Sequence, residues 1–160
     1  MDAATVSLVE ITRDNYRGFF KLEVTPAQED FVASNAVSMA QAHFHPEATM
    51  FGIVAGGEPV GFAMLEDHTK HPESADEAYR KEPYVGLWRF MIAAGHQRKG
   101  YGARAMELLI AYARTRAPAK AMLLSFVPKA GGPGEFYARH GFVETGEMAG
   151  EERVMRLPLE

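Results

Sequence analysis

The sequence predicts a single α/β domain in which a mixed, mostly antiparallel sheet is flanked by helices. The chain has 160 residues, which suits one ordinary domain, so we treat residues 1–160 as one unit. Hydrophobic residues make up 47% and charged residues 24%, a mix typical of globular rather than disordered chains. Strand-like and helix-like segments follow in the order β-α-α-β-β-β-α-β-α-β-β, without an internal repeat or a linker.

The elements of the first half follow from the polarity period and from capping residues. Alternating apolar and polar side chains indicate a first strand and a later hairpin, whose turn is Gly56-Gly57. Thr12 can cap the first helix, and the capping box Thr25-Pro26-Ala27-Gln28 starts the second, with proline at its first position. The expected elements are a strand at Val6–Ile11, a helix at Arg13–Val24, a helix from Thr25 to about Ala42, and hairpin strands at Met50–Ala55 and Val60–Leu65.

The second half begins with a polar segment, Glu66–Pro83, that has no hydrophobic period and is expected to be a long functional loop. Farther on, apolar residues recur on one face of a long helix at Gly102–Arg116. A short helix at Glu135–His140 ends at Gly141. The expected elements after the loop are a strand at Tyr84–Ile92, a helix at Gly102–Arg116, a strand at Met122–Val127, a helix at Glu135–His140, and a closing hairpin at Phe142–Met148 and Arg153–Leu157.

The composition excludes several classes of protein. Without cysteine there is no disulfide framework, zinc–thiolate site, iron–sulfur cluster or cysteine nucleophile, and we expect no metal. A net charge of −4 argues against nucleic-acid binding. No apolar run reaches the roughly 20 residues of a membrane span, and Met1-Asp2-Ala3-Ala4 lacks the basic start of a secretory signal, so we expect a cytoplasmic protein that contacts no membrane.

The charge is distributed unevenly along the chain. Up to Tyr84 there are 14 acidic and 6 basic residues, and from Val85 onward 7 acidic and 11 basic ones. This fits an anionic ligand held by the second half and a cationic one near the first. The alternative is a chance distribution over solvated faces.

The stretch from Phe90 to Arg104 carries the main functional signal. A strand leads into the loop Gln97-Arg98-Lys99-Gly100-Tyr101-Gly102, which opens a long helix. Free N–H groups at a helix start bind anions, and glycines let a phosphate approach closely. A Walker loop needs lysine where Tyr101 stands, and a dinucleotide site needs an acid in the next strand, which has none over residues 119–127. A dinucleotide site stays a weaker alternative, as does a plain glycine-rich turn with surface bases.

Two motifs together resemble one superfamily. The loop Gln97–Gly102 resembles the pyrophosphate loop of the GNAT superfamily, the acetyl-coenzyme-A-dependent N-acetyltransferases, and Phe136-Tyr137-Ala138-Arg139-His140-Gly141-Phe142 is similar to its Phe-Tyr-x-x-x-Gly-Phe segment. With the order of elements, the resemblance covers nearly the whole chain. It implies a GNAT fold whose sheet splays open between the strand ending at Ile92 and the strand Met122–Val127. It also implies acetyl-CoA as co-substrate and, because dimers are common in the family, a homodimer.

The resemblance also implies roles for particular residues. Tyr137 would be the general acid that reprotonates the departing thiolate, and a backbone N–H near Phe90 would polarise the acetyl carbonyl. Ala130 and Pro133 depart from the family pattern, since many relatives have Asn and Ala there, so the Asn contact to pantetheine is lost or replaced by backbone. The residues implied to hold the coenzyme are Phe90, Met91, Ile92, Gln97, Arg98, Lys99, Gly100, Tyr101, Gly102, Ala103 and Tyr137.

The general base and the acceptor are less well defined. Some relatives carry a carboxylate base where this chain has Gly86-Leu87-Trp88, so water, a backbone carbonyl or an acid such as Glu66 are the candidates, whereas His140 before a helix-ending glycine is typical of a structural residue. The first half resembles the bacterial spermidine/spermine acetyltransferase-like branch, notably in Val60-Gly61-Phe62-Ala63-Met64, which implies a polyamine acceptor. Glu29 and Glu66 could bind ammonium groups, and Trp88 could stack on a cation.

Other small-molecule amines remain open as acceptors, namely an amino sugar antibiotic or an amino acid, as does a protein amine. A different class is open too: a catalytically silent GNAT fold that binds coenzyme A as a sensor or assembly module. Release of thiol from acetyl-CoA in the presence of different amines distinguishes the enzyme from the module.

Overall fold

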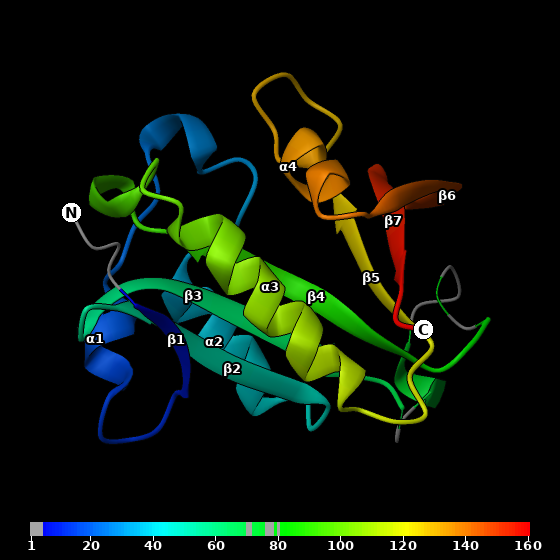
Figure 1. Ribbon diagram of the computed structural model, residues 1–160, viewed down its shortest axis with the longest axis horizontal. Coiled ribbons are helices and arrows are strands. Elements are labelled where there is room, and N and C mark those ends of the chain that lie inside the picture. Colours follow the sequence, from blue (N-terminus) through cyan, green and yellow to red (C-terminus); the bar gives the residue numbers. More distant parts are fainter. Residues whose placement is uncertain (1–4, 70–71, 76–78, 80) are drawn as a thin grey trace.

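The strands form one mixed sheet in the order β1-β2-β3-β4-β5-β7-β6 (Figure 1). The structure is a computed structural model that describes residues 5–69, 72–75, 79 and 81–160. Its strands are β1 Val6–Glu10, β2 Ala48–Ala55, β3 Glu58–Asp67, β4 Tyr84–Ile92, β5 Ala121–Phe126, β6 Val143–Ala149 and β7 Glu152–Pro158. Its helices are α1 Tyr16–Phe20, α2 Asn35–His43, α3 Tyr101–Arg114 and α4 Gly134–Arg139, with short 3-10 turns η1 Pro26–Gln28, η2 Pro72–Ser74 and η4 Ala94–His96. The predicted mixed, mostly antiparallel sheet is confirmed, since among the described strands only β4 and β5 pair in parallel.

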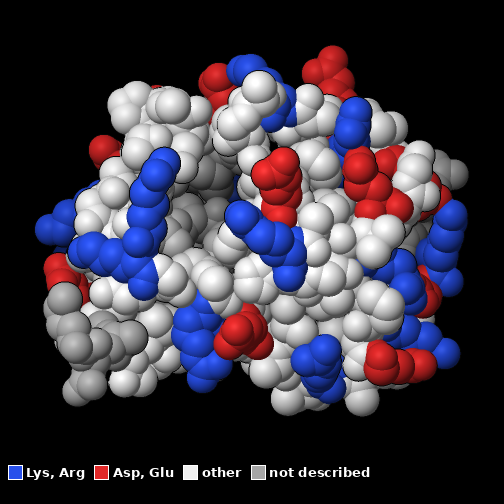
Figure 2. Space-filling model, turned by 45° about the horizontal axis from the view of Figure 1, so that its top comes forward, with Lys and Arg blue, Asp and Glu red and all other residues white. Residues whose placement is uncertain are grey.

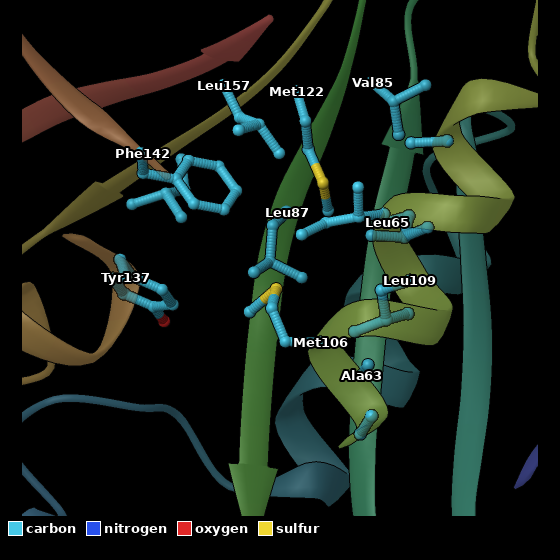
Figure 3. Close-up of a cluster of buried hydrophobic side chains, with 14 of the residues drawn as sticks. Ala63, Leu65, Val85, Leu87, Met106, Leu109, Met122, Tyr137, Phe142 and Leu157 are labelled. Atoms are coloured by element: carbon cyan, nitrogen blue, oxygen red, sulfur yellow. The ribbon is translucent and has the colours of Figure 1, made fainter. Parts of the chain in front are cut away.

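Helices cover both faces of this sheet. In Figure 1, α3 crosses the front face and α2 lies behind it. The face of α3 predicted from the sequence is buried, and Met106 and Leu109 pack against Leu65, Val85 and Leu87 of the sheet (Figure 3). Phe62 and Met64 point to the opposite face, where Phe19 and Met91 complete a second cluster under α1 and α2. Burial on both faces explains why β3 reads as an almost unbroken apolar run.

The first two predicted helices are wrong in extent. The helix expected at Arg13–Val24 is only the five residues of α1, and Thr12 does not cap it; the backbone N–H of Thr12 instead donates to Oδ1 of Asn15 at 2.8 Å. The capping box at Thr25 forms, but it opens only the 3-10 turn η1. The helix begins again at α2, where the Ser34 hydroxyl accepts a hydrogen bond from Val37 N–H at 3.2 Å. Ser34 is thus a second capping residue within the predicted helix, and it divides that helix in two. The segment between η1 and α2 is not helical, and it lines the site described below.

The loop expected at Glu66–Pro83 is described only in part. β3 continues to Asp67, two residues into that segment, and η2 forms a single turn. Residues 70, 71, 76–78 and 80 of the expected loop, and the start Met1–Ala4, lie outside the described residues. Within the described part of the chain, no helix is long and apolar enough to cross a membrane.

Asn35 fixes the place where α1 and α2 meet. Its side chain is buried, with the residue only 2% exposed, and its amide donates to the Phe19 carbonyl at 2.9 Å and to the Leu22 carbonyl at 3.3 Å. These carbonyls lie at and just after the end of α1, where helix carbonyls run out of N–H donors from the next turn. The Phe19 carbonyl also accepts from the backbone N–H of Leu22 at 3.2 Å, so the side chain of Asn35 adds a second bond there and supplies the Leu22 carbonyl with a donor.

We expect Asn35→Ala to lower the free energy of unfolding by about 1–3 kcal/mol, because it removes two hydrogen bonds from a buried side chain and leaves the Leu22 carbonyl without its donor. Urea denaturation followed by circular dichroism measures this. Val37→Ala on the same helix is the control; Val37 is 48% exposed, and its loss is expected to change stability by less than about 0.5 kcal/mol. Equal losses for the two variants would contradict a specific role for the amide.

The sheet opens between β4 and β5. The two strands pair only through Tyr84–Gly86 and Ala121–Leu123, and beyond these residues they diverge, as Figure 1 shows. β5 stays paired with β7 along its full length. The predicted splay is therefore confirmed. It leaves one edge of β4 with backbone groups that a bound molecule can pair with.

Candidate active site

The turn between β4 and α3 presents a row of unpaired backbone donors. Arg98 and Gly100 have φ of 62° and 83°, so the chain turns through left-handed conformations just before the helix. Among the described residues, the N–H groups from Arg98 to Ala103 donate no hydrogen bond to the protein. Consecutive N–H groups in such a turn, at the positive end of a long helix, form an anion-binding concavity.

This turn borders a hollow of about 530 Å³, which we call the loop hollow. Figure 2 shows a hollow on this side of the molecule, with Lys and Arg side chains on its rim. Lys99 and Tyr101 do not line the loop hollow; Tyr101 packs against the core under α3. The implied coenzyme-binding residues that do line it are Phe90, Met91, Ile92, Gln97, Arg98, Gly100, Gly102, Ala103 and Tyr137.

Gly102 keeps the floor of the loop hollow open. A Cβ at this position would lie 3.6 Å from Cγ1 of Ile92 and 3.7 Å from Cε2 of Phe136, both of which line the hollow. The chain itself would tolerate that atom at ordinary contact distance. A larger side chain would extend between Ile92 and Phe136 into the space that the hollow provides.

The side chain of Gln97 is already engaged in hydrogen bonds within the protein. Its amide donates to the Ile92 carbonyl at 2.8 Å and to Oε1 of Gln28 at 2.7 Å. Gln28 is also the last residue of the capping box that opens η1. The side chain of Gln97 therefore ties the turn to the end of β4 and to η1.

The backbone of β4 directs Phe90 into the opened sheet. A register shift opposite Met64 and Leu65 leaves Trp88 as an extra residue in β4, a β-bulge. The N–H of Ala93 donates to the Val60 carbonyl of β3 at 2.9 Å. Because hydrogen-bonding directions alternate along a strand, the N–H groups of Ile92 and Phe90 face away from β3, toward β5. At this level β5 is not paired with β4, so the Phe90 N–H is available to a ligand.

A second hollow, of about 730 Å³, meets the loop hollow inside the splayed sheet. We call it the acid hollow, because five carboxylate side chains line it: Glu29, Asp30, Glu47, Glu66 and Glu152. Trp88 lines it as well, so all the acceptor-binding residues predicted from the sequence, Glu29, Glu66 and Trp88, come together here. The residues that line both hollows are Phe31, Val32, Phe90, Pro133 and Tyr137.

Tyr137 stands at the junction of the two hollows. It is 8% exposed, at the margin of the main core cluster (Figure 3), and in the described residues its hydroxyl has no hydrogen-bond partner. Burial, together with the nearby charge of Glu152, raises the pKa of Tyr137 above the ordinary value of 10.0. The hydroxyl therefore keeps its proton at neutral pH and can act as an acid rather than a base.

Two of the five carboxylates of the acid hollow are paired with histidines. Glu66 lies 2.5 Å from Nε2 of the buried His68, and Glu47 lies 2.9 Å from Nδ1 of His45. Burial works to raise the pKa of Glu47, but its backbone hydrogen bond and the contact with His45 outweigh this and hold the pKa below its ordinary value. The ring of His45 also packs edge-on against Trp88. This end of the hollow keeps negative charge next to an aromatic face, a suitable environment for an organic cation.

Several residues of the site were not found from the sequence. Glu47 and Glu152 lie in segments that carry no motif. Arg89 follows the bulge at Trp88, lines the acid hollow, and donates to the side-chain oxygen of Gln41 on α2 at 3.0 Å. His140, assigned a structural role from the sequence, lines neither hollow and packs on Phe136. Among the described residues, no group of three His, Asp or Glu side chains could hold a metal ion.

The segment with the unusual residues Ala130 and Pro133 packs across the opening of the sheet. Lys129 Nζ lies 3.0 Å from Oδ2 of Asp30, and a Cβ at Gly132 would lie 3.0 Å from the ring of Phe31. Pro133 lines both hollows, whereas Ala130 lines neither. The glycine-rich segment therefore contacts the segment after η1 above the junction of the two hollows.

The fold, the donor-rich turn and the buried tyrosine together define a class of enzyme. A model of the acetyltransferase (GNAT) family matches residues 6–142, and the chain belongs to this family. It is an acetyl-CoA-dependent N-acetyltransferase that acts on an amine acceptor.

Individual relatives are more distant. The chain is 27% identical over 147 residues to the spermine/spermidine N(1)-acetyltransferase of Bacillus subtilis strain 168, with 90% of this chain and 91% of that protein aligned. An acetyltransferase from Thermus thermophilus has a similar fold, with a TM-score of 0.74, 16% identity and 99% of each chain covered. An aminoglycoside acetyltransferase in complex with coenzyme A gives a TM-score of 0.74 at 15% identity, over 96% of this chain and 95% of that one. These likenesses confirm the GNAT fold.

Proposed function

We propose that the enzyme transfers the acetyl group of acetyl-CoA to a primary amine of a small polycation such as spermidine or spermine. The acid hollow is the observation that supports this most strongly. It joins the loop hollow at Phe90 and Tyr137, so an amine that enters it meets a thioester held from the other side. Its carboxylates match the several positive charges of a polyamine. The 27% identity to a spermine/spermidine acetyltransferase points to the same substrate class.

The donor-rich turn suits the diphosphate of coenzyme A. The N–H groups from Arg98 to Ala103 supply hydrogen bonds, and the guanidinium of Arg98 supplies charge. Lys99, exposed beside the turn, adds attraction at longer range. Phe90, Met91 and Ile92 border the path from this turn to the junction, where the pantetheine arm would lie along the free edge of β4.

At the junction, two groups of the chain serve acyl transfer. The Phe90 N–H is placed to donate to the acetyl oxygen and to stabilise the negative charge that develops there as the amine attacks. The Tyr137 hydroxyl is placed to protonate the sulfur as the C–S bond breaks. The amine loses its first proton to solvent before it attacks.

The spacing along β4 favours an acceptor with more than one charge. Glu66 pairs in register with Gly86, four residues before Phe90. At a strand rise of about 3.3 Å per residue, shortened by the bulge, this places Glu66 about 10 Å from the reacting centre. An ammonium group held by Glu66 and Glu47 against Trp88 would then belong to the same molecule whose other end reacts.

We expect Glu66→Gln to raise the KM for spermidine about tenfold, because the distal ammonium loses a charged partner. With butylamine, which has no distal ammonium, the same variant is expected to behave like the wild type. Thiol release from acetyl-CoA, measured across polyamines, monoamines, amino sugars and amino acids, tests both statements. Glu58→Gln, at the exposed other end of β3, is the matched control and should change neither KM.

Two outcomes of this panel would contradict the proposal. Faster turnover of monoamines or amino sugars than of polyamines would overturn the acceptor class. Binding of acetyl-CoA without thiol release from any amine would instead support a non-catalytic coenzyme-binding module.

A further inference from the structure

Glu152 is the one partly buried carboxylate of the acid hollow that has no hydrogen-bond or ion-pair partner among the described residues. Asp30 pairs with Lys129, Glu47 with His45 and Glu66 with His68. Glu29 has no such pair, but it is exposed at the end of η1, on the outer side of the hollow. Among the described residues, the side chain of Glu152 makes neither a hydrogen bond nor an ion pair, although it is only partly exposed and lines the hollow. A carboxylate in this position is free to receive a proton or an ammonium group from a ligand.

The β6–β7 hairpin sets the position of Glu152. Glu152 pairs with Ala149 across the tight turn, in which Gly150 has φ of 62°. The next residue, Arg153, pairs with Phe126, the last residue of β5. Val154, on the same face of β7 as Glu152, is buried to 1% exposure and anchors the strand. Glu152 is thereby held at the end of β5 that has parted from β4, on the opposite wall of the opening from Phe90.

The charge of Glu152 acts on Tyr137 at the junction of the two hollows and on Arg89, which lines the acid hollow alone. It contributes, after burial, to raising the pKa of Tyr137 on α4. Burial lowers the pKa of Arg89 on β4, and the charges of Glu152 and Glu66 oppose this. Glu152 is hydrogen-bonded to neither group, and all three side chains line the acid hollow.

We propose that Glu152 is the catalytic residue that accepts the proton of the reacting amine. This rests on the proposed function, in which the acid hollow receives the acceptor. The amine, already neutral, forms a bond from its nitrogen lone pair to the acetyl carbon, and an N–H proton passes to a Glu152 carboxylate oxygen. The C–S bond then breaks, and the sulfur takes the proton of Tyr137. The proton on Glu152 returns through water to the Tyr137 oxygen, which restores both residues and leaves an amide and a thiol.

A carboxylate is strong enough for this step. A free alkylammonium has a pKa near 10, about six units above that of a glutamate, so Glu152 would be a poor base toward it. A nitrogen that has begun to bond to the carbonyl carbon is far more acidic, and proton transfer to a carboxylate is then favourable.

The test is turnover by Glu152→Gln, measured with whichever amine of the panel the wild type uses fastest. We expect kcat to fall about 100-fold, while the affinity for acetyl-CoA stays within about twofold, because Glu152 does not line the loop hollow. Glu151→Gln makes the same charge change in the exposed turn next to it and is expected to leave kcat unchanged.

A second variant distinguishes a proton acceptor from a residue that merely supports the hairpin. In Glu152→Ala, added formate can occupy the vacated space, and we expect it to raise kcat at least tenfold in a saturable manner. A kcat of Glu152→Gln within threefold of wild type, or no rescue of Glu152→Ala by formate, would overturn the proposal. Because the test uses the amine that the wild type acetylates fastest, an error in the polyamine assignment would not affect it. If Tyr137→Phe is inactive while Glu152→Gln is fully active, only the role of Glu152 is overturned.

Discussion

Tyr137→Phe is expected to lower kcat by about 100-fold or more while the affinity for acetyl-CoA changes less than about threefold. The substitution removes a single hydroxyl, which has no partner in the described residues, so packing at the junction of the two hollows is preserved. What is lost is the proton for the departing sulfur, and general acid catalysis of this kind is typically worth 10²–10⁴ in rate. Steady-state kinetics of thiol release and calorimetry of acetyl-CoA binding measure the two quantities separately.

The pH dependence gives a further check on this role. Because burial and Glu152 raise the pKa of Tyr137 above 10.0, the acid remains protonated at all lower pH values. The amine acceptor, in contrast, becomes nucleophilic as it loses its proton, so the wild-type rate should rise with pH and show no decline below about pH 10. Turnover by Tyr137→Phe equal to that of the wild type, or a decline near pH 8, would argue against Tyr137 as the acid.

Gly102→Leu is expected to weaken acetyl-CoA binding at least tenfold, a loss of about 1.4 kcal/mol or more. Its side chain would start 3.6 Å from Ile92 and 3.7 Å from Phe136 and extend into the loop hollow, in front of the free N–H groups of the turn. Calorimetric titration with coenzyme A measures the change. The fold should persist, because the first added carbon meets its neighbours at ordinary contact distance.

Gly95→Leu provides the matched control for this variant. Gly95 lies in the same connection between β4 and α3, but a Cβ there would have open space around it, and the residue does not line the loop hollow. Its affinity for coenzyme A is expected to stay within about twofold of wild type. If both variants bind coenzyme A as tightly as the wild type, the turn after β4 is not the diphosphate site.

Local patterns in the sequence predicted the parts of this protein that depend on neighbouring residues. The β2–β3 hairpin, the strand β4 and the buried face of α3 have the expected positions to within a few residues, because alternation, helical period and a glycine turn act over short distances. The helix expected from Thr25 to Ala42 failed for a reason outside that range. Ser34 caps a new helix, and Asn35 is drawn to the end of α1, contacts that the period of apolar residues does not encode.

The sequence by itself determined the family, because the turn Gln97–Gly102 and the Phe136–Phe142 segment are each continuous in the chain. Only the tertiary structure decided which carboxylates share the acid hollow. Glu66, which the sequence had suggested, lies there with Glu47, just before β2, and with Glu152, at the start of β7, because β4 and β5 separate after three paired residues. Isolated carboxylates are common on any soluble surface, so nothing in their local sequence distinguishes those that face a ligand from those that face water.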